Sequence, residues 1–299
     1  MSVRILQFGT TGQLARELLG QAGDFDVEIT ALSRAEADFA EPAAVARIAR
    51  DAQADLVVIA AAHTAVDKAE SEPGLARTIN AEAPAAIARA LGADGAALVT
   101  ISTDYVFSGD KGSPYVETDA TGPLGVYGAT KLEGEGAVLA ASPRALVIRT
   151  SWVVSSHGKN FIKTMLRLAG EGAPMRVVAD QVGRPTAARD LARFILSQAE
   201  RLSTAKAGDP AFGVVHFANT GEVSWRDLAQ TVVELAMGKG APTVQGIPTS
   251  EYPTPARRPL RASMDTGKLE RVFGVTPRPW REAVAEIVAE LTGEQRSAA

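Results

Sequence analysis

The chain of 299 residues contains no cysteine and only three histidines, His63, His157 and His216. Without cysteine it can form neither disulfides nor thiolate metal sites, and a thiol nucleophile is excluded. The histidines are too scattered along the sequence to suggest a zinc site of the kind in which several imidazoles hold the metal. The sequence therefore predicts no metal ligands.

The sequence also lacks long apolar runs and an excess of positive charge. No stretch approaches the length of a membrane span, and 31 Lys and Arg against 35 Asp and Glu give a formal net charge of −4. We expect neither a membrane nor a nucleic acid as a partner. The sequence enters a strand pattern almost directly, without a charged leader and an apolar core, so the expected location is cytoplasmic.

Apolar runs and helical patterns alternate along most of the chain. The runs with strand character are residues 3–8, 27–32, 55–62, 96–103 and 145–149. This alternation predicts an α/β fold, a doubly wound, Rossmann-like parallel sheet with right-handed crossovers. We expect residues 1–155 to form a dinucleotide-binding domain that 187–218 rejoin. Residues 156–186 and 219–299 are expected to form a smaller C-terminal α/β subdomain that binds the substrate.

A glycine-rich turn follows the first apolar run, with the sequence Gly9-Thr-Thr-Gly12-Gln-Leu-Ala15. Gly9 permits a tight turn, Gly12 lets backbone N–H groups approach a pyrophosphate at a helix N-terminus, and Ala15 allows close packing of helix on strand. An ordinary strand–turn–helix is the alternative interpretation. We predict cofactor contacts at Gly9, Thr11, Gly12, Gln13 and Leu14.

The end of the second apolar run indicates which dinucleotide binds. An NAD site usually carries an acid there for the ribose 2′-hydroxyl, whereas this chain has Ser33-Arg34. A hydroxyl and a guanidinium suit a 2′-phosphate, unless Arg34 only faces solvent. We predict NADPH as the cofactor and leave NADH open as a second one.

Tyr127 and Lys131 are four residues apart, so on a helix they lie on one face, one turn from each other. A nearby ammonium favours the phenolate, which would make Tyr127 a proton donor or acceptor near neutral pH. Thr103 ends the apolar run at 96–103. A hydroxyl at a strand end, then Tyr and Lys, behind a nucleotide loop resembles the short-chain dehydrogenase/reductase superfamily.

Several segments together resemble one family, the dTDP-4-dehydrorhamnose reductases, and they cover the chain nearly end to end. These segments are 60–73, 102–107, 117–119 with Pro123, 126–128, 149–152, 160–161, 164–169, 180–181 and 252–259. The family is an extended short-chain reductase that reduces the 4-keto group of dTDP-4-dehydro-β-L-rhamnose with NAD(P)H, giving dTDP-L-rhamnose. This resemblance implies a dTDP-sugar as the substrate.

The resemblance also implies roles for individual residues. Tyr127 would protonate O4, Lys131 would hold the nicotinamide ribose and lower the pKa of Tyr127, and Thr103 would orient the keto oxygen. Further cofactor contacts are expected at Ser33, Arg34, Asp38, Phe39, Ala61, Ala62, His63 and Thr64. Substrate contacts are expected at Asp104, Tyr105, Trp152, Arg257 and Arg258. For His63 and Trp152 a packing role remains open, and the paired arginines could instead form a surface ion pair.

The chain departs from the family at some positions. Ile59 and Ala15 stand where relatives often have Asn and Gly, and neither change removes a catalytic group. Some members dimerise through a magnesium ion held by glutamates, but here Arg189 stands where such a glutamate is expected, although Glu17 and Glu290 remain. Arginine cannot ligate magnesium, so a magnesium-bridged dimer is doubtful, and a monomer or a homodimer is expected.

Two other functions remain open. A related nucleotide-sugar epimerase or dehydratase would use the same Tyr–Lys pair, but a dehydratase commonly has Asp-Glu after the Thr, where this chain has Asp104-Tyr105. A non-catalytic, NADP-binding regulatory subunit is the other alternative, and the intact set of Thr103, Tyr127 and Lys131 argues against it.

Overall fold

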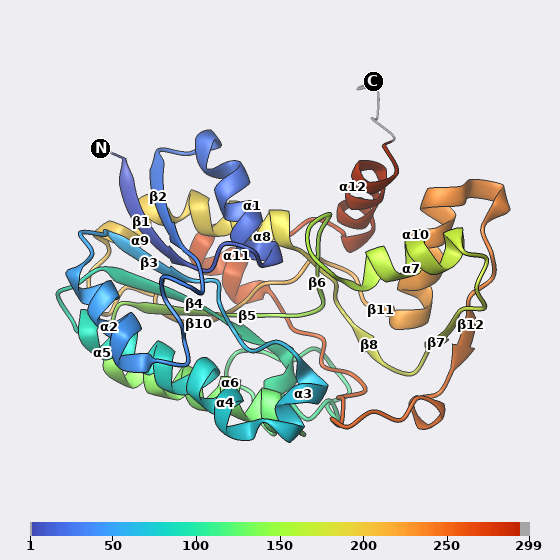
Figure 1. Ribbon diagram of the computed structural model, residues 1–299, viewed down its shortest axis with the longest axis horizontal. Helices are drawn as coiled ribbons and strands as arrows, with labels where there is room; N and C mark the ends of the chain where they lie inside the picture. The colour runs from blue at the N-terminus through green and yellow to red at the C-terminus, as the bar shows by residue number, and fades with distance from the viewer. Residues whose placement is uncertain (1, 294–299) are drawn as a thin grey trace.

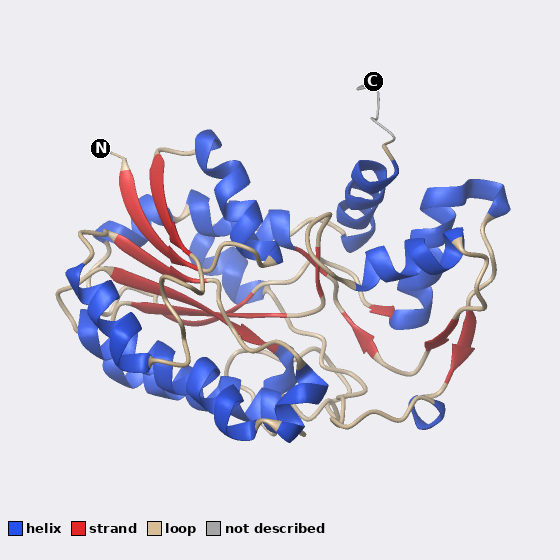
Figure 2. Cartoon of the chain, in the orientation of Figure 1, coloured by secondary structure: helices blue, strands red, loops and turns tan. Residues whose placement is uncertain are grey.

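A computed structural model describes residues 2–293 of the chain. A sheet with helices on both faces lies beside a smaller, mainly helical body (Figures 1 and 2). The sheet contains six strands in the order β2-β1-β3-β4-β5-β10, and every neighbouring pair is parallel. The strands are β1 (Val3–Phe8), β2 (Val27–Leu32), β3 (Leu56–Ile59), β4 (Ala97–Thr103), β5 (Ala145–Thr150) and β10 (Gly213–His216).

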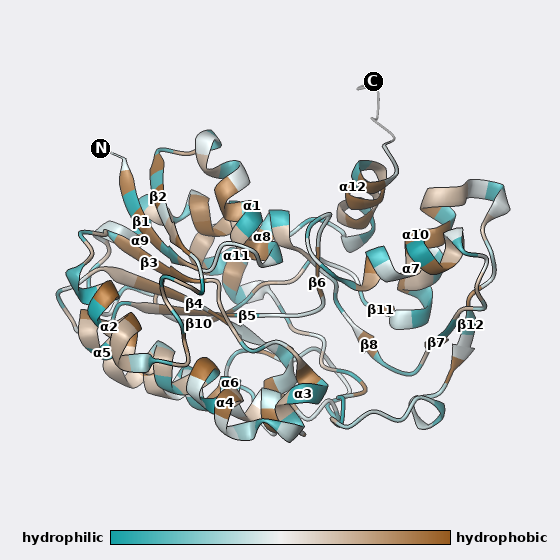
Figure 3. Cartoon of the chain, viewed as in Figure 1, coloured by the Kyte–Doolittle hydropathy of each residue, from teal (hydrophilic) through white to brown (hydrophobic). Residues whose placement is uncertain are grey.

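Helices cover both faces of this sheet, so the doubly wound α/β fold is confirmed. One apolar core joins the sheet to α1 (Gln13–Gln21), α8 (Ala188–Ser197), α9 (Ala199–Thr204) and α11 (Gly267–Phe273). The core on the other face includes α2 (Pro42–Asp51), α5 (Ala83–Leu91) and α6 (Val126–Ala141). The central strands are accordingly hydrophobic along their length (Figure 3), as expected for strands that are buried on both sides.

The smaller body contains three helices around its own apolar core, namely α7 (Phe161–Gly170), α10 (Trp225–Met237) and α12 (Trp280–Thr292). The Ser224 hydroxyl caps α10 by accepting a hydrogen bond from the Asp227 N–H. Its short strands pair as β7 (Arg176–Val178) with β12 (Gln245–Ile247), and β8 (Val182–Gly183) with β11 (Val223–Ser224). A third pair, β6 (Val153–Val154) with β9 (Thr186–Ala187), lies between the two bodies.

Two elements differ from the sequence-based prediction. The strand expected at 55–62 ends at Ile59, and the small residues after it leave the sheet. The chain then forms two short helices, α3 (Val66–Ser71) and α4 (Pro73–Arg77), and a π-helical turn over Thr78–Glu82 before α5. Because β10 pairs with β5, the stretch that ends near residue 218 lies in the sheet body, while the functional division of the chain remains a prediction.

Candidate active site

The residues predicted to act in catalysis meet at one edge of the sheet. Thr103 is the last residue of β4, and Tyr127 and Lys131 lie in the first two turns of α6. The glycine-rich turn follows β1 at the same edge, because the carboxyl ends of parallel strands share an edge. The strand order changes direction between β1 and β3, and ligands of doubly wound folds bind at this switch point.

The glycine-rich turn has the geometry expected for a dinucleotide. Gly9 has φ +103°, a conformation that side chains disfavour, and a Cβ there would lie 3.4 Å from the backbone of Ala60. Gly12 is the N-cap of α1, and no side chain caps this helix, so its first N–H groups can bind an anion. The Gln13 side chain points elsewhere: its Nε2 donates to the Val153 carbonyl, and its Oε1 accepts from Ser155 and Asn160.

The sequence-based analysis did not identify a role for Gln7, which lies beneath this turn. Its buried Nε2 donates to the carbonyls of Gly9 and Ala15, at 2.8 and 3.2 Å. One side chain therefore connects both ends of the turn to β1. A polar residue in an otherwise apolar central strand was the signal available in the sequence.

An acid lies at the end of β2, although the sequence there was interpreted as cationic. Glu36 Oε2 accepts hydrogen bonds from the Ser33 hydroxyl and the Ser33 N–H, at 2.7 and 2.8 Å. The Arg34 side chain is 78% exposed and lies 3.4 Å from Asp38, whose carboxylate also accepts from the Ala40 N–H. The Arg34 guanidinium is therefore exposed and loosely paired, whereas the Ser33 hydroxyl is bound to Glu36.

Phe39, Ala61, Ala62, His63 and Thr64 were all predicted to contact the cofactor. Phe39 is buried, and its ring packs edge-on against Phe8. His63 turns away from solvent, with Nε2 3.7 Å from Glu72. Ala61 is half-buried, and Ala62 and Thr64 are exposed.

Asn80 is a second residue that the sequence-based analysis missed. It is buried in the π-helical turn, where its side chain accepts from the His63 N–H at 2.9 Å and donates to the Thr130 hydroxyl at 3.2 Å. It thereby joins the loop after β3 to α6 beside Lys131. Its signal was a single amide in an alanine-rich helical stretch.

Thr103 lies in contact with Asp104, Tyr105 and Tyr127. Its hydroxyl donates to Asp104 Oδ1 at 3.0 Å and accepts from the Tyr105 N–H at 3.2 Å, and it lies close enough to the Tyr127 phenol to affect its pKa. Burial raises the pKa of Asp104 to about 7, so this carboxyl titrates close to neutral pH.

The pKa of Tyr127 is shifted in the direction opposite to the prediction. Burial raises it to about 12, the neighbouring Thr103 hydroxyl acts to lower it, and the charge of Asp104 acts to raise it. Lys131 was expected to lower this pKa, and that expectation is wrong for this structure because desolvation outweighs every neighbour. Tyr127 is therefore a neutral phenol at neutral pH, which is the form that can donate a proton.

Lys131 is itself buried, with 6% of its surface exposed. Burial lowers the pKa of Lys131 to about 8, although the Glu135 carboxylate acts in the opposite direction. Glu135 is held by Arg149 in a buried, bidentate ion pair with N–O distances of 2.6 to 3.1 Å. The ammonium is therefore charged at pH 7 but close to its titration range.

α6 approaches the end of β4 closely at Gly128. A Cβ at this position would lie 2.1 Å from the Tyr105 carbonyl oxygen, so only glycine allows this packing. The Tyr105 ring meets the Tyr127 ring edge-on with centroids 5.6 Å apart. The Tyr127-Gly128 pair thus sets the distance between the phenol and the strand end.

Comparison with known proteins gives the family of the chain. A family model described as "RmlD substrate binding domain" matches residues 3–293. A dTDP-4-dehydrorhamnose reductase from Sinorhizobium fredii is 43% identical, over 99% of this chain and 100% of the relative. The chain belongs to the dTDP-4-dehydrorhamnose reductase family.

Solved structures of dTDP-4-dehydrorhamnose reductases have the same fold as this chain. One from Clostridium acetobutylicum is 37% identical with a TM-score of 0.88, and the match covers 96% of this chain and 99% of that chain. One from Bacillus anthracis, in complex with NADP, is 32% identical with a TM-score of 0.88, covering 97% and 100%. No helix within residues 2–293 is long and apolar enough to cross a membrane.

Within this reductase fold, Trp152 packs against other aromatic rings. It stacks on Trp225 with ring centroids 3.6 Å apart, and it lies against the core of the smaller body. Its φ of +47° is rare for a bulky side chain. This geometry favours the packing role over the sugar-contacting role, the two roles that the sequence had left open.

The paired arginines have different surroundings in this reductase fold. Arg258 forms a bidentate ion pair with Asp67 of α3, with N–O distances of 2.8 and 3.1 Å. Arg257 is exposed, and no ion pair is recorded for it among residues 2–293. Arg258 is thus held against the site, and Arg257 is the freer of the two.

Glu17 and Glu290, the two acids that the sequence left as possible metal ligands, bind an arginine in the structure. The Arg189 guanidinium lies 3.5 Å from Glu17 and 2.9 Å from Glu290. Within residues 2–293 no group of three or more His, Asp or Glu side chains could hold a metal ion. The position of a cation between the two acids is therefore taken by a side chain.

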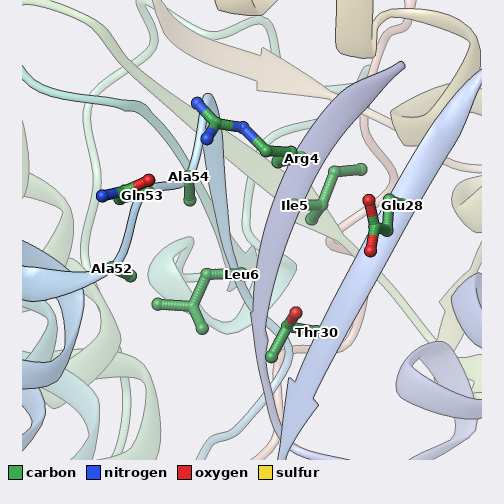
Figure 4. A pocket seen from close by; sticks show the side chains of 8 residues that line it. All are labelled: Arg4, Ile5, Leu6, Glu28, Thr30, Ala52, Gln53 and Ala54. Atoms are coloured by element: carbon green, nitrogen blue, oxygen red, sulfur yellow. The ribbon is translucent and has the colours of Figure 1, made fainter.

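A hollow of about 390 Å³ lies elsewhere on the sheet (Figure 4). Its walls come from β1, β2 and the segment 52–54, and Arg4 and Glu28 lie near the amino ends of their strands. Arg4 is bound there to Asp55 by two hydrogen bonds from its guanidinium. This hollow is separate from Thr103 and Tyr127, which lie at the carboxyl edge.

Proposed function

We propose that this chain reduces the 4-keto group of dTDP-4-dehydro-β-L-rhamnose to a hydroxyl with NADPH, giving dTDP-L-rhamnose. The observation that carries the proposal is the position of Tyr127, on α6, beside Thr103, the last residue of β4, with Lys131 one turn further along α6. Family membership supports the same reaction, since the relatives are dTDP-4-dehydrorhamnose reductases and one solved relative carries NADP.

Thr103, Tyr127 and Lys131 have different roles in this reaction. When bound, the nicotinamide supplies the hydride that reduces C4. Thr103 orients the keto oxygen, and Tyr127, a neutral phenol whose pKa is about 12, gives its proton to O4 as negative charge develops there. Lys131 is charged below its pKa of about 8, so its ammonium holds the nicotinamide ribose and offsets the charge left on Tyr127.

The cofactor and the sugar nucleotide have separate binding elements. The N-terminus of α1 after Gly12 receives the pyrophosphate of NADPH, and Arg34 receives its 2′-phosphate. Asp104 and Tyr105 border the sugar, and Arg257 offers a free guanidinium to the diphosphate of the substrate. NADH is a second, weaker cofactor in this proposal, the protein acts in the cytoplasm as a monomer or homodimer, and neither nucleic acid nor membrane is a partner.

A turnover assay tests the proposal. Purified protein is mixed with NADPH and dTDP-4-dehydro-β-L-rhamnose, and the loss of reduced nicotinamide is followed by absorbance. Tyr127→Phe removes the proton donor and should lower kcat by about a thousandfold, within the range expected for loss of general acid catalysis. Tyr115→Phe is the matched control, because Tyr115 is a buried phenol that hydrogen-bonds to the Gly109 N–H outside the proposed machinery.

The outcomes separate the alternatives. Oxidation that survives Tyr115→Phe and disappears with Tyr127→Phe supports the reductase. No oxidation despite measurable NADPH binding would favour a non-catalytic, NADP-binding subunit or a different keto-sugar. Release of water from the sugar without net NADPH oxidation would favour a dehydratase, which the Asp104-Tyr105 sequence disfavours.

A further inference from the structure

We propose that helix α3 is a positioning element. Through Glu70 and Asp67 it fixes the position of the proton donor relative to the substrate-binding segment. These two acids are three residues apart and therefore lie on the same face of the helix. Glu70 binds the start of α6, which carries Tyr127, and Asp67 binds the segment 252–259, which carries Arg257 and Arg258. The inference rests on the proposed role of Tyr127 as the proton donor.

Glu70 caps the catalytic helix from outside it. Its Oε1 accepts a hydrogen bond from the Val126 N–H at 2.8 Å, directly before Tyr127. The N-cap residue of α6 is Gly125, which has no side chain to cap the helix, so the acid of a second helix does this instead. A carboxylate at a helix N-terminus also interacts favourably with the helix dipole. A Cβ on Gly125 would lie 2.5 Å from Glu70 Oε1, which shows how closely the two elements meet.

Asp67 binds the segment 252–259, which is far from it in sequence. Its carboxylate accepts two hydrogen bonds from the Arg258 guanidinium and one from the Ala256 N–H at 3.1 Å. The chain from β12 to this segment passes beside α3 (Figure 1). Such a bidentate pair with an added backbone bond fixes both position and orientation. The Arg258 ion pair lowers the pKa of Asp67, so the pair stays ionised at neutral pH.

The two contacts converge on the active site. The Tyr105 ring, at the end of β4, packs against the Tyr127 ring of α6. α3 itself packs on α6. A small shift of Glu70 therefore moves the phenol, whereas a small shift of Asp67 moves the segment that carries Arg257, the guanidinium proposed to bind the diphosphate. The two acids should then affect different kinetic constants.

The test compares single variants of the full-length protein. Glu70→Ala removes the cap, and Glu70→Gln keeps an acceptor but removes the charge. Asp67→Asn breaks the bidentate pair. Asp55→Asn is the matched control, because Asp55 also binds a guanidinium at two atoms and a backbone N–H, those of Arg4, at the opposite edge of the sheet.

Glu70→Ala should lower kcat about five- to tenfold, the factor expected for loss of a helix cap, with an unchanged KM for NADPH. Glu70→Gln should recover most of that loss. Asp67→Asn should raise the KM for the sugar nucleotide about tenfold, as expected for loss of a charge-assisted pair, with kcat within about twofold. Asp55→Asn should leave all three constants unchanged.

The proposal would be overturned if Glu70→Ala and Asp67→Asn changed kcat and KM equally. It would also be overturned if Asp55→Asn reproduced their effects, because both results would indicate a general stabilising role. If Tyr127→Phe is inactive but Glu70→Ala has a normal kcat, only the proposed role of α3 is overturned. Activity that persists in Tyr127→Phe would instead contradict the proposed function itself.

Discussion

At the scale of single residues, burial rather than neighbouring charge sets the chemistry of the Tyr–Lys pair. The sequence spacing correctly placed Tyr127 and Lys131 one turn apart on a helix, but it predicted the wrong direction for the pKa of Tyr127. A spacing pattern says which side chains are neighbours, whereas desolvation depends on the elements that pack over them. In the structure the phenol stays protonated and the ammonium is the group that titrates near neutral pH.

The alkaline limb of the pH profile should therefore report Lys131. Its charged form is complete well below pH 8 and is lost as the pH rises through its pKa of about 8, while Tyr127 remains neutral over this range. We expect kcat/KM for NADPH to fall above about pH 8. Lys131→Arg keeps the charge at all these pH values and should remove the limb, at the cost of a lower rate.

Lys68→Arg is the matched control for this experiment, because Lys68 is an exposed lysine paired with Glu72 and its variant should retain the limb. A limb that stays near pH 8 in Lys131→Arg would assign it to another group, and Asp104, whose pKa is about 7, would be the first to consider.

Arg34 should determine the preference for NADPH. The side chain is 78% exposed and only loosely paired with Asp38, so little has to be broken before it meets a 2′-phosphate. Arg34→Ala should weaken NADPH binding about tenfold, the factor for one charge-assisted hydrogen bond, and leave NADH binding nearly unchanged. Kd values from cofactor fluorescence would measure both.

Arg50→Ala provides the comparison for Arg34, since Arg50 is likewise exposed and paired with an acid, Asp51. Equal losses of NADPH and NADH affinity in Arg34→Ala would remove the 2′-phosphate argument. They would also point to Glu36, the acid bound to Ser33, as the residue that meets the ribose.

At the scale of elements, the sequence predicted the first five strands, β1 to β5, because each is an apolar run of ordinary strand length. The alanine-rich stretch 78–91 favours one continuous helix, where the structure has a π-helical turn followed by α5, since alanine-rich sequence does not distinguish these helical forms. Contacts between distant elements were also invisible: Glu70 caps α6 from 56 residues away. Local capping patterns cannot report a cap supplied by another helix.

The glycine-rich turn depends on an element beneath it. Gln7 holds the Gly9 carbonyl, and because the C=O and N–H of one peptide point in opposite directions, this aims the Thr10 N–H towards the cofactor side. Gln7→Leu should raise the Kd for NADPH about fivefold, as expected for the loss of one net hydrogen bond, with little change in Tm. The Gln7 Oε1 has no hydrogen-bond partner in the described chain, so leucine also removes a costly buried acceptor.

Thr100→Val is the matched control for Gln7→Leu, because Thr100 is a buried polar residue of β4 that does not touch the turn. Calorimetric titration with NADPH, alongside thermal unfolding, would separate the two effects. Loss of affinity that merely follows a fall in Tm would show that Gln7 stabilises the sheet and does not orient the turn.

At the scale of the whole molecule, the sheet body and the smaller body are joined by polar contacts that no local pattern predicted. Gln13 of α1 binds residues 153–160, and Arg278 bridges Asp190 of α8 and Glu286 of α12. The substrate must touch both bodies in the proposed function. These contacts therefore fix the two halves of the site relative to each other.

Arg189 belongs to the same set of contacts, and it leads to a prediction about magnesium. Its guanidinium lies between Glu17 of α1 and Glu290 of α12, so an internal cation already occupies the position between the two acids. Adding magnesium or EDTA should leave both the activity and the mass measured by light scattering unchanged. Arg189→Glu would put three carboxylates at this position, an oxygen-only set that suits a hard divalent cation.

The Arg189→Glu variant should lose stability through repulsion among its acids and regain it when magnesium is added, with a rise in Tm that calcium or magnesium produces and sodium at equal ionic strength does not. Arg193→Glu, which reverses the charge of another arginine on α8, controls for charge reversal and should show no such response. A magnesium-dependent rise in mass or Tm in the unaltered protein would contradict the argument, because it would mean that the acids release Arg189 to bind metal.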